Sequence, residues 1–251
     1  MENEAIIQIR DLHREFVVGS ETVHALNGIN FSIYRGEFVS IMGTSGSGKS
    51  TLLNILGCLD KPSSGEYIIN GTSINKLNIN QLSTLRNRQI GFVFQNYNLL
   101  ARTTAIDNVQ LPLLYNSNIS AKERKERAIA ALEAVKLQGR MDHFPNQLSG
   151  GQQQRVAIAR AIVNDPVIIL ADEATGNLDT RTSYELMTLF QELHSKGKTI
   201  AFVTHEPDIA TFTTRTIKLR DGQIVLDENI QQQSAAEALA EYEKNMKHTM
   251  I

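Results

Sequence analysis

A glycine-rich segment between an apolar strand and an apolar helix constrains the fold of this chain more than any other feature. The strand pattern covers residues 38–42, and the helical pattern runs from Ser50 to Leu59. Glycines at 43, 46 and 48 lie between them, and because glycine has no Cβ atom, backbone NH groups and the helix terminus can approach an anion closely. This order of strand, loop and helix is typical of a phosphate-binding loop in an α/β fold.

The side chains at the end of this loop fit a nucleoside phosphate with Mg²⁺. Lys49 supplies positive charge, the Ser50 hydroxyl is placed to ligate Mg²⁺, and Thr51 is placed to hydrogen bond a phosphate oxygen. A glycine-rich turn that matches by chance is expected in about one chain in a hundred, and the flanking strand and helix make it rarer. We therefore predict a nucleotide site formed by Gly43, Thr44, Ser45, Gly46, Ser47, Gly48, Lys49, Ser50 and Thr51.

Length and composition limit the class of protein. At 251 residues, with 41% hydrophobic residues and a net charge of -2, the chain is typical of a globular protein with one large domain or two small ones. No run approaches the ~18 apolar residues that cross a bilayer, and the acidic residues 1–4 are unlike a secretory signal. The single cysteine, Cys58, excludes an intramolecular disulfide and a cysteine-cluster zinc site, and burial as a small hydrophobe is expected for it. The charge balance does not indicate a nucleic-acid partner, and we expect a cytoplasmic protein.

The pattern of the remaining elements predicts an α/β protein with an antiparallel start. Residues 6–9, 16–18 and 23–33 read as short strands separated by turns at Gly19-Ser20 and Asn27-Gly28. Further apolar strands are expected, with helical patterns between several of them, which favours a parallel sheet. These strands cover residues 66–69, 90–94, 167–171, 199–203 and 215–219.

Helical patterns dominate the stretch between Gln95 and Ser149. The segment 121–135 is the clearest amphipathic helix, and its charged first turns are more typical of a solvated face than of a binding patch. We expect one domain over residues 1–227, with a helical subdomain inserted at about 96–160, and a tail over 228–251 that forms a peripheral helix or a frayed end.

Two acidic residues follow the apolar run 167–171. The Asp172 carboxylate is expected at the carboxyl edge of the buried sheet, where nucleotides bind in open α/β folds, and it suits a Mg²⁺ ligand. Glu173 is placed to orient or deprotonate a water that attacks the γ-phosphate. The alternative is an acidic turn that faces solvent.

Polar residues also follow two other strands at this edge. His205 comes after residues 199–204, and a γ-phosphate contact is favoured over the usual structural role of a lone histidine. Gln95 follows residues 90–94, and its amide can contact the metal or the attacking water, although Gln95 alone is weak support.

A second glycine pair opens another helix. Ser149 suits an N-cap, Gly150 and Gly151 leave the first turn bare, and a helical pattern continues to Ile162. A bare helix N-terminus attracts phosphate, yet one nucleotide needs only one such site. The segment from Leu148 to Gln152 is therefore expected to serve a second nucleotide in a head-to-tail dimer, and a simple capped helix is the alternative.

In this order the motifs resemble those of ATP-binding-cassette ATPases, from about Ile7 to Leu226. The resemblance implies ATP and Mg²⁺ as ligands, with Ser50, Gln95 and Asp172 at the metal and Glu173, His205 and Gln95 as catalytic residues. It makes Phe16 the aromatic that stacks on adenine, usually a tyrosine. The remaining roles are Walker A for Gly43 to Thr51, the Q-loop for Gln95, the signature for Leu148, Ser149, Gly150, Gly151 and Gln152, Walker B for residues 167–172, the D-loop for residues 177–179 including Asp179, and the switch histidine for His205.

The resemblance also implies an assembly. In the family, two ATP molecules are sandwiched between the Walker motifs of one subunit and the signature of the other, and closure drives membrane subunits. Residues 43–62, 90–95 and 148–160 are similar to the lipoprotein-releasing and macrolide-exporter type, LolD and MacB. This similarity implies a homodimer on the cytoplasmic face of the inner membrane with a separate permease that resembles FtsX or MacB.

Two residues depart from these relatives. Thr44 and Ala174 stand where proline is common. Each change frees the unfolded backbone by about 0.4 to 1 kcal/mol and removes no ligand, so activity is expected to survive, although Ala174 can loosen the D-loop.

Other functions remain open at this level. A regulatory ATPase that resembles FtsE and signals across the membrane without transport fits equally well, and a non-transport cassette ATPase fits less well because the chain lacks a coiled-coil insertion, zinc cysteines or a second cassette. Residues 95–114, including Tyr97, Leu99 and Leu100, are expected to dock the permease, and packing inside the helical subdomain explains them equally well.

Overall fold

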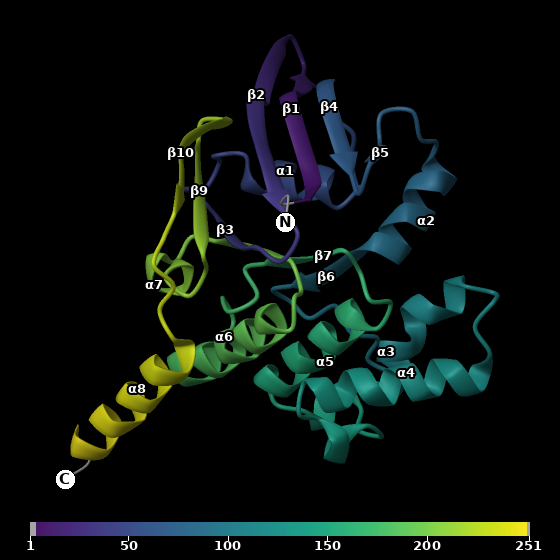
Figure 1. Cartoon of the computed structure of the whole chain (residues 1–251), viewed down its shortest axis with the longest axis vertical. Coiled ribbons are helices and arrows are strands. Elements are labelled where there is room, and N and C mark those ends of the chain that lie inside the picture. The colour runs from purple at the N-terminus through teal and green to yellow at the C-terminus, as the bar shows by residue number, and fades with distance from the viewer. Residues whose placement is uncertain (1–3, 250–251) are drawn as a thin grey trace.

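The computed structural model describes residues 4–249, which form two sheets and a group of helices (Figure 1). An antiparallel sheet lies at the top of the view, a mixed six-stranded sheet crosses the middle, and most helices lie below it. The predicted fold class, an α/β core with an antiparallel β subdomain and a helical subdomain, is confirmed.

The central sheet has the order β10-β9-β3-β8-β7-β6. All neighbouring pairs are parallel except β10 with β9, which is antiparallel. The bounds agree with the predicted apolar runs to within one residue at each end. They are β3 Phe38–Met42, β6 Ile90–Phe94, β7 Ile168–Asp172, β8 Ile200–Thr204 and β9 Arg215–Arg220, with β10 Gln223–Asn229 at the edge.

Alternate residues of these strands point into two separate cores. In β7, Ile168 and Leu170 pack with α1 (Lys49–Leu56) and the antiparallel sheet, whereas Ile169 and Ala171 pack with the helices on the other face. All four are at most 1% exposed. Burial on both faces explains why the strand reads as a continuous apolar run.

The antiparallel sheet has the order β2-β1-β4-β5. Its strands are β1 Ala5–Val18, β2 Glu21–Tyr34, β4 Ser64–Ile69 and β5 Thr72–Ser73. The predicted turn at Gly19-Ser20 is confirmed, but the predicted turn at Asn27-Gly28 is wrong, because both residues lie inside β2. Gly28 has φ +72°, next to a register shift between β1 and β2, so the turn-like dipeptide forms a bulge in a long strand.

Most helices lie on one side of the central sheet. The predicted helix at 121–135 is α4, Ala121–Ala134, and the helix after the second glycine pair is α5, Gly150–Ile162. Cys58, just after α1, is buried as expected, and burial raises the pKa of its thiol to about 12. The remaining segments are α2 Ile79–Gln89, α3 Ala105–Gln110, α6 Thr180–Ser195, α7 Pro207–Ala210 and the short 3-10 helices η1 Leu111–Tyr115, η2 Gln138–Arg140 and η3 Pro145–Gln147.

The C-terminal segment forms a helix that packs against the core. Strand β10 continues to Asn229, two residues beyond the expected domain end, and α8, Ala235–Thr249, then runs antiparallel along α6. Ala235 is fully buried, and the ring of Tyr242 meets that of Tyr184 edge to face. Within residues 4–249, no helix combines the length and apolar character needed to cross a membrane.

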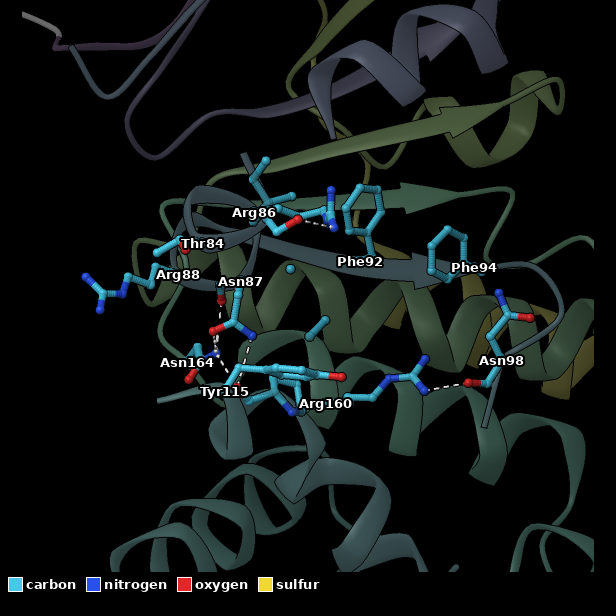
Figure 2. A pocket seen from close by; sticks show the side chains of 15 residues that line it. Thr84, Arg86, Asn87, Arg88, Phe92, Phe94, Asn98, Tyr115, Arg160 and Asn164 are labelled. Atoms are coloured by element: carbon cyan, nitrogen blue, oxygen red, sulfur yellow. Dashed lines mark hydrogen bonds between the residues drawn. The ribbon is translucent and has the colours of Figure 1, made fainter. Parts of the chain in front are cut away.

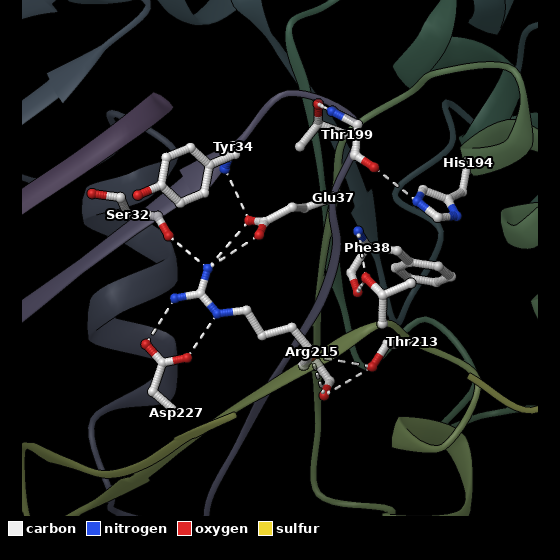
Figure 3. A network of polar contacts seen from close by, with 12 residues as sticks. Ser32, Tyr34, Glu37, Phe38, His194, Thr199, Thr213, Arg215 and Asp227 are labelled. Atoms are coloured by element: carbon white, nitrogen blue, oxygen red, sulfur yellow. Dashed lines mark hydrogen bonds and ion pairs between the residues drawn. The ribbon is translucent and has the colours of Figure 1, made fainter. Parts of the chain in front are cut away.

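Arg215, the first residue of β9, connects its strand with three other segments (Figure 3). Its guanidinium makes two 2.7 Å bonds to the Asp227 carboxylate on β10, one of 2.8 Å to the Ser32 carbonyl on β2, and contacts of 3.2 and 3.4 Å to Glu37. The hydrogen bonds to Asp227 raise the pKa of Arg215. Glu37 in turn accepts from the backbone NH of Tyr34, so the guanidinium fixes the turn into β3, the strand that leads to the glycine-rich loop.

We predict that Arg215→Met lowers the free energy of unfolding by about 3 kcal/mol, because Glu37 and Asp227 are left partly buried without their cation. Urea unfolding at neutral pH measures the change. Arg127→Met is the control, since the Arg127–Glu123 pair is exposed and such pairs contribute at most about 1 kcal/mol. Equal losses in the two variants would contradict a structural role for the Arg215 network.

Candidate functional site

A cavity of about 1040 Å³ opens above the glycine-rich loop. It is bounded by the loop and by the ends of β2, β7, β8 and β9. The lining residues are Val23, His24, Ala25, Met42, Gly43, Thr44, Ser45, Gly46, Gly48, Lys49, Ser50, Thr51, Glu173, His205, Pro207, Lys218, Asp221 and Gly222. The parallel strands thus bring the predicted phosphate loop, Glu173 and His205 to one hollow.

The loop is shaped by backbone contacts that only glycine permits. Gly48 has φ +103°, and a Cβ atom there would lie 2.6 Å from the Ala25 carbonyl oxygen. A Cβ atom on Gly43 would lie 2.5 Å from the Leu219 carbonyl oxygen. Lys49 is buried and donates from Nζ to the Gly43 carbonyl at 2.7 Å and to the Thr44 carbonyl at 2.9 Å. The Lys49 ammonium group therefore lies against the backbone of the loop. The NH groups of the same loop are suited to bind an anion.

Helix α1 begins in this cavity with uncapped NH groups. Its N-cap is Gly48, which has no side chain to accept from the first turn, and the turn contains no acidic residue. The positive helix end and the Lys49 ammonium both suit a phosphate. The hydroxyl of Ser47 is buried and has no hydrogen-bond partner within the described chain, which leaves one further polar group in the loop unused.

Asp172 and Glu173 lie at the carboxyl end of β7, as expected. Burial, followed by the neighbouring Glu173 carboxylate, raises the pKa of Asp172, and the Lys49 ammonium opposes that rise. Glu173 adopts φ +44°, a left-handed conformation that is strained for a residue with a Cβ atom. Its Oε1 lies 3.0 Å from Nδ1 of His205, which follows β8. The two residues predicted to act at the γ-phosphate are therefore in direct contact.

Gln95 makes two hydrogen bonds with Asn177, in the loop before α6. Its Nε2 donates to Oδ1 of Asn177 at 3.3 Å, and Nδ2 of Asn177 donates back to the Gln95 carbonyl at 3.2 Å. A Cβ atom on Gly176 would lie 2.8 Å from Nε2 of Gln95. Asp179 caps α6 by accepting from the NH and hydroxyl of Thr182, and these hydrogen bonds lower the pKa of Asp179.

The predicted N-cap of α5 is confirmed. Ser149 Oγ accepts from the Gln152 NH, and the Gln152 side chain accepts from the Ser149 NH, which is a capping box. Cβ atoms on Gly150 and Gly151 would lie 2.8 Å from the Tyr97 hydroxyl and 2.5 Å from Cγ2 of Thr182. Within the described chain, no residue of the Leu148 to Gln152 segment lines the cavity.

Phe16 lies beside the cavity rather than in its wall. Its ring is 38% exposed, its cross-strand partner Val23 lines the cavity, and the Arg14 guanidinium carbon lies 4.3 Å from the ring centroid. Arg14 is held in turn by Asp60 at 2.8 Å. A cation over the ring is a favourable contact, and it orients the ring at the rim of the cavity.

The residues expected at a Mg²⁺ ion are divided between the cavity and the sheet edge: Ser50 lines the cavity, whereas Asp172 and Gln95 end or follow the neighbouring strands and are not among its lining residues. Ser50, Asp172 and Gln95 offer a hydroxyl, a carboxylate and an amide oxygen, the hard ligands that Mg²⁺ prefers. Across residues 4–249, no group of three or more His, Cys, Asp or Glu could hold a metal ion by itself. The donor set therefore suits an ion that shares its coordination with phosphate oxygens.

Sequence reasoning missed several residues of the site. Lys218, Asp221 and Gly222 enter the cavity wall from the hairpin between β9 and β10, although nothing in their local pattern suggests a phosphate site. The bonds between Asn177 and Gln95 join segments more than 80 positions apart. Such long-range pairs have no signal in a single sequence.

Sequence comparison relates the chain to ABC transporter proteins. A family profile described as "ABC transporter" matches residues 26–176. An uncharacterized ABC transporter ATP-binding protein of Bacillus subtilis, YknY, is 54% identical over 220 residues, which is 88% of this chain and 95% of that protein. A macrolide export ATP-binding/permease protein MacB of Chlorobium phaeobacteroides is 54% identical over 223 residues, 89% of this chain but only 34% of that protein.

Solved structures of a dimeric ABC transporter cassette resemble this chain. A dimeric bacterial ABC transporter cassette, MJ0796, superposes with a TM-score of 0.81 at 46% identity and covers 90% of this chain and 100% of that one. A dimeric post-hydrolysis state of the same cassette, bound to ADP and Pi, gives a TM-score of 0.81 at 45% identity with the same coverage.

Proposed function

The chain belongs to the ABC transporter family as an ATP-binding cassette with ATPase activity, and on this premise we propose how its site works. Two copies bind head to tail around two ATP molecules, and the closed dimer drives a separate membrane permease of the MacB or FtsX type in export or lipoprotein release. The subunit lies against the cytoplasmic face of the membrane through that permease.

One observation carries the dimer proposal. The N-terminus of α5, capped by Ser149 and followed by Gly150 and Gly151, contributes no residue to the nucleotide cavity of its own chain within residues 4–249, although a helix N-terminus can bind a phosphate. A second copy can present the same segment to that cavity from outside. The dimeric cassettes that resemble this chain support the arrangement.

Within each site the residues take separate tasks. The loop from Gly43 to Thr51 and the start of α1 hold the phosphates, and Phe16 stacks on the adenine at the rim. Ser50, Asp172 and Gln95 would hold Mg²⁺, which neutralises phosphate charge when bound. Glu173 accepts a proton from the attacking water, and its contact with His205 holds the carboxylate in place.

Replacement of Glu173 by Gln tests this assignment. We predict that Glu173→Gln lowers the ATP turnover rate by at least about 100-fold, because the general base is lost, while the amide keeps the contact with His205. ATP binding persists, and an ATP-dependent dimer accumulates. Phosphate release measures turnover, and light scattering coupled to gel filtration measures the dimer.

Glu206→Gln is the matched control for Glu173→Gln. Glu206 lies one residue after His205, and its carboxylate accepts from the Thr175 hydroxyl at 3.3 Å rather than facing the cavity. Turnover in this variant should stay within about threefold of the unmodified chain. Unchanged turnover in Glu173→Gln would overturn the assignment of the base.

A second hollow, of about 720 Å³, is proposed to dock the permease (Figure 2). It lies between α2, β6, η1 and α5, with the stacked rings of Phe92 and Phe94 on one side and Tyr115 and Arg160 on the other. Among its described lining residues are Arg86, Arg88 and Arg160 but no Asp or Glu. This docking groove therefore suits a short segment with apolar and acidic side chains.

The docking groove refines the surface expected from the sequence. Of residues 95–114, Asn98 and Pro112 line it, and Leu100 is 50% exposed. Tyr97 instead packs at Gly150, and Leu99 packs against the hydrophobic core. These two residues therefore fit the alternative, which is packing inside the helical subdomain. Arg160 donates to the Tyr97 and Asn98 carbonyls at 2.8 and 2.6 Å, which ties the docking groove to the segment after Gln95.

Charge at the rim of the docking groove should block binding to the membrane. Leu114 and Tyr115 are 57% and 83% exposed, so the double variant Leu114→Asp/Tyr115→Asp should fold and keep its ATPase activity in solution. We predict that this double variant no longer sediments with membrane vesicles from cells that produce the chain.

Val225→Asp/Leu226→Asp is the matched control for the docking groove, because it places the same charges on an adjacent exposed apolar pair in β10. This variant should sediment like the unmodified chain. Equal sedimentation of both double variants would argue against the docking groove as the permease site.

A further inference from the structure

We infer that Gln154, on the signature helix α5, is a positioning residue that couples this helix to the two loops that carry Gln95 and Glu173. Its side chain is fully buried. Nε2 donates one hydrogen bond to the Phe94 carbonyl at 3.2 Å and another to the Ala174 carbonyl at 2.9 Å. One amide group therefore joins three elements of the site. This inference rests on the proposed function.

Both acceptors are direct neighbours of the reacting groups. Phe94 precedes Gln95 at the end of β6, and Ala174 follows Glu173 at the end of β7. The two strands pair in parallel, with Phe94 opposite Asp172. A shift of α5 that moved the Gln154 amide would thus act on the backbone within one residue of each catalytic side chain. A displacement of that kind matters because reactions at a phosphate depend on the position of the water and its base.

The backbone around Glu173 needs such a restraint. Glu173 has φ +44°, and its backbone is fixed by its NH bond to the Val203 carbonyl and by its carbonyl, which accepts from Gly176, both at 2.9 Å. Ala174, the next residue, is 1% exposed, and the bond from Gln154 is the side-chain contact that holds its carbonyl among the described residues. A strained conformation persists only where its surroundings determine it.

Gln154 places an amide in a buried position where an apolar side chain would leave no polar atom without a hydrogen bond. Oε1 of Gln154 is buried and has no hydrogen-bond partner within the described residues. Leaving an acceptor unsatisfied in a core is unfavourable, and methionine of similar length would avoid it. The two donated bonds are what glutamine adds at this position, and they fix the amide with its NH₂ group toward the catalytic loops.

The side chain next to Gln154 on α5 makes a different contact. Gln153 donates from Nε2 to the Leu148 carbonyl at 3.1 Å, within the segment that opens the same helix. Gln154 is therefore the glutamine of this run whose amide leaves α5 to reach β6 and β7. The start of α5 and the two catalytic loops are then positioned together. A shift of the signature segment in one copy would therefore change the position of Glu173 in the same copy.

Gln154→Met tests the inference in the full chain. It removes both hydrogen bonds and the unsatisfied acceptor but keeps the length of the side chain. We predict that kcat for ATP hydrolysis falls about 10- to 100-fold, while KM for ATP stays within about threefold. Gln154→Asn, which is polar but too short to hold both carbonyls, should lower kcat as well, and it decides the question if the methionine variant does not fold.

Gln191→Met is the matched control for Gln154→Met. Gln191 also bridges two backbone carbonyls through Nε2, those of Phe212 and Gln233 at 3.0 and 2.7 Å, but it lies on α6 away from the cavity. Its kcat should remain within about threefold of the unmodified chain. If Gln154→Met or Gln154→Asn folds and its kcat falls no further than that of Gln191→Met, the positioning role is wrong. Loss of turnover in Glu173→Gln with normal turnover in Gln154→Met would reject only this inference and leave the proposed function intact.

Discussion

The site depends on the parallel pairing of β3, β8, β7 and β6. Met42 lies opposite Thr204, Val203 opposite Asp172, and Asp172 opposite Phe94, so all four strands end at the same level of the sheet. This register brings the residues that follow the strands, namely the phosphate loop, His205, Glu173 and Gln95, to the same edge of the sheet. Because alternate side chains of these strands pack into two different cores, a one-residue slip in the register would move each side chain to the wrong core, and the packing of both cores therefore holds the catalytic residues in place.

Local patterns predicted the central strands and the phosphate loop because continuous apolar runs and glycine spacing leave few alternatives. The turn predicted at Asn27-Gly28 is wrong because this dipeptide has more than one structural outcome. It favours turns, but it also fits a bulge when tertiary pairing extends the strand on both sides. Residues that act through long-range contacts had no local signal. Asn177 at Gln95 and Gln154 between two loops are recognisable only once the chain is folded.

The glycine-rich N-terminus of α5 and the buried amide of Gln154 belong to the same helix. Its first turn does not line the nucleotide cavity of its own chain within the described residues, and its middle reaches the loops of Gln95 and Glu173 through hydrogen bonds. Arg160, further along the same helix, holds the carbonyls of Tyr97 and Asn98 beside the docking groove. In this account α5 connects a neighbouring copy, the hydrolytic residues and the membrane partner.

The central claim is that the signature of one copy completes the nucleotide site of another, and a mixing experiment tests it most directly. Lys49→Met removes the cation of the phosphate loop, and Gly150→Asp adds a negatively charged side chain at the start of α5, so each variant alone should be inactive. A mixed dimer contains one intact site, built from the loop of the Gly150→Asp chain and the signature of the Lys49→Met chain. The account predicts that mixing restores ATP hydrolysis. A mixture as inactive as its components would show that the signature acts within its own chain.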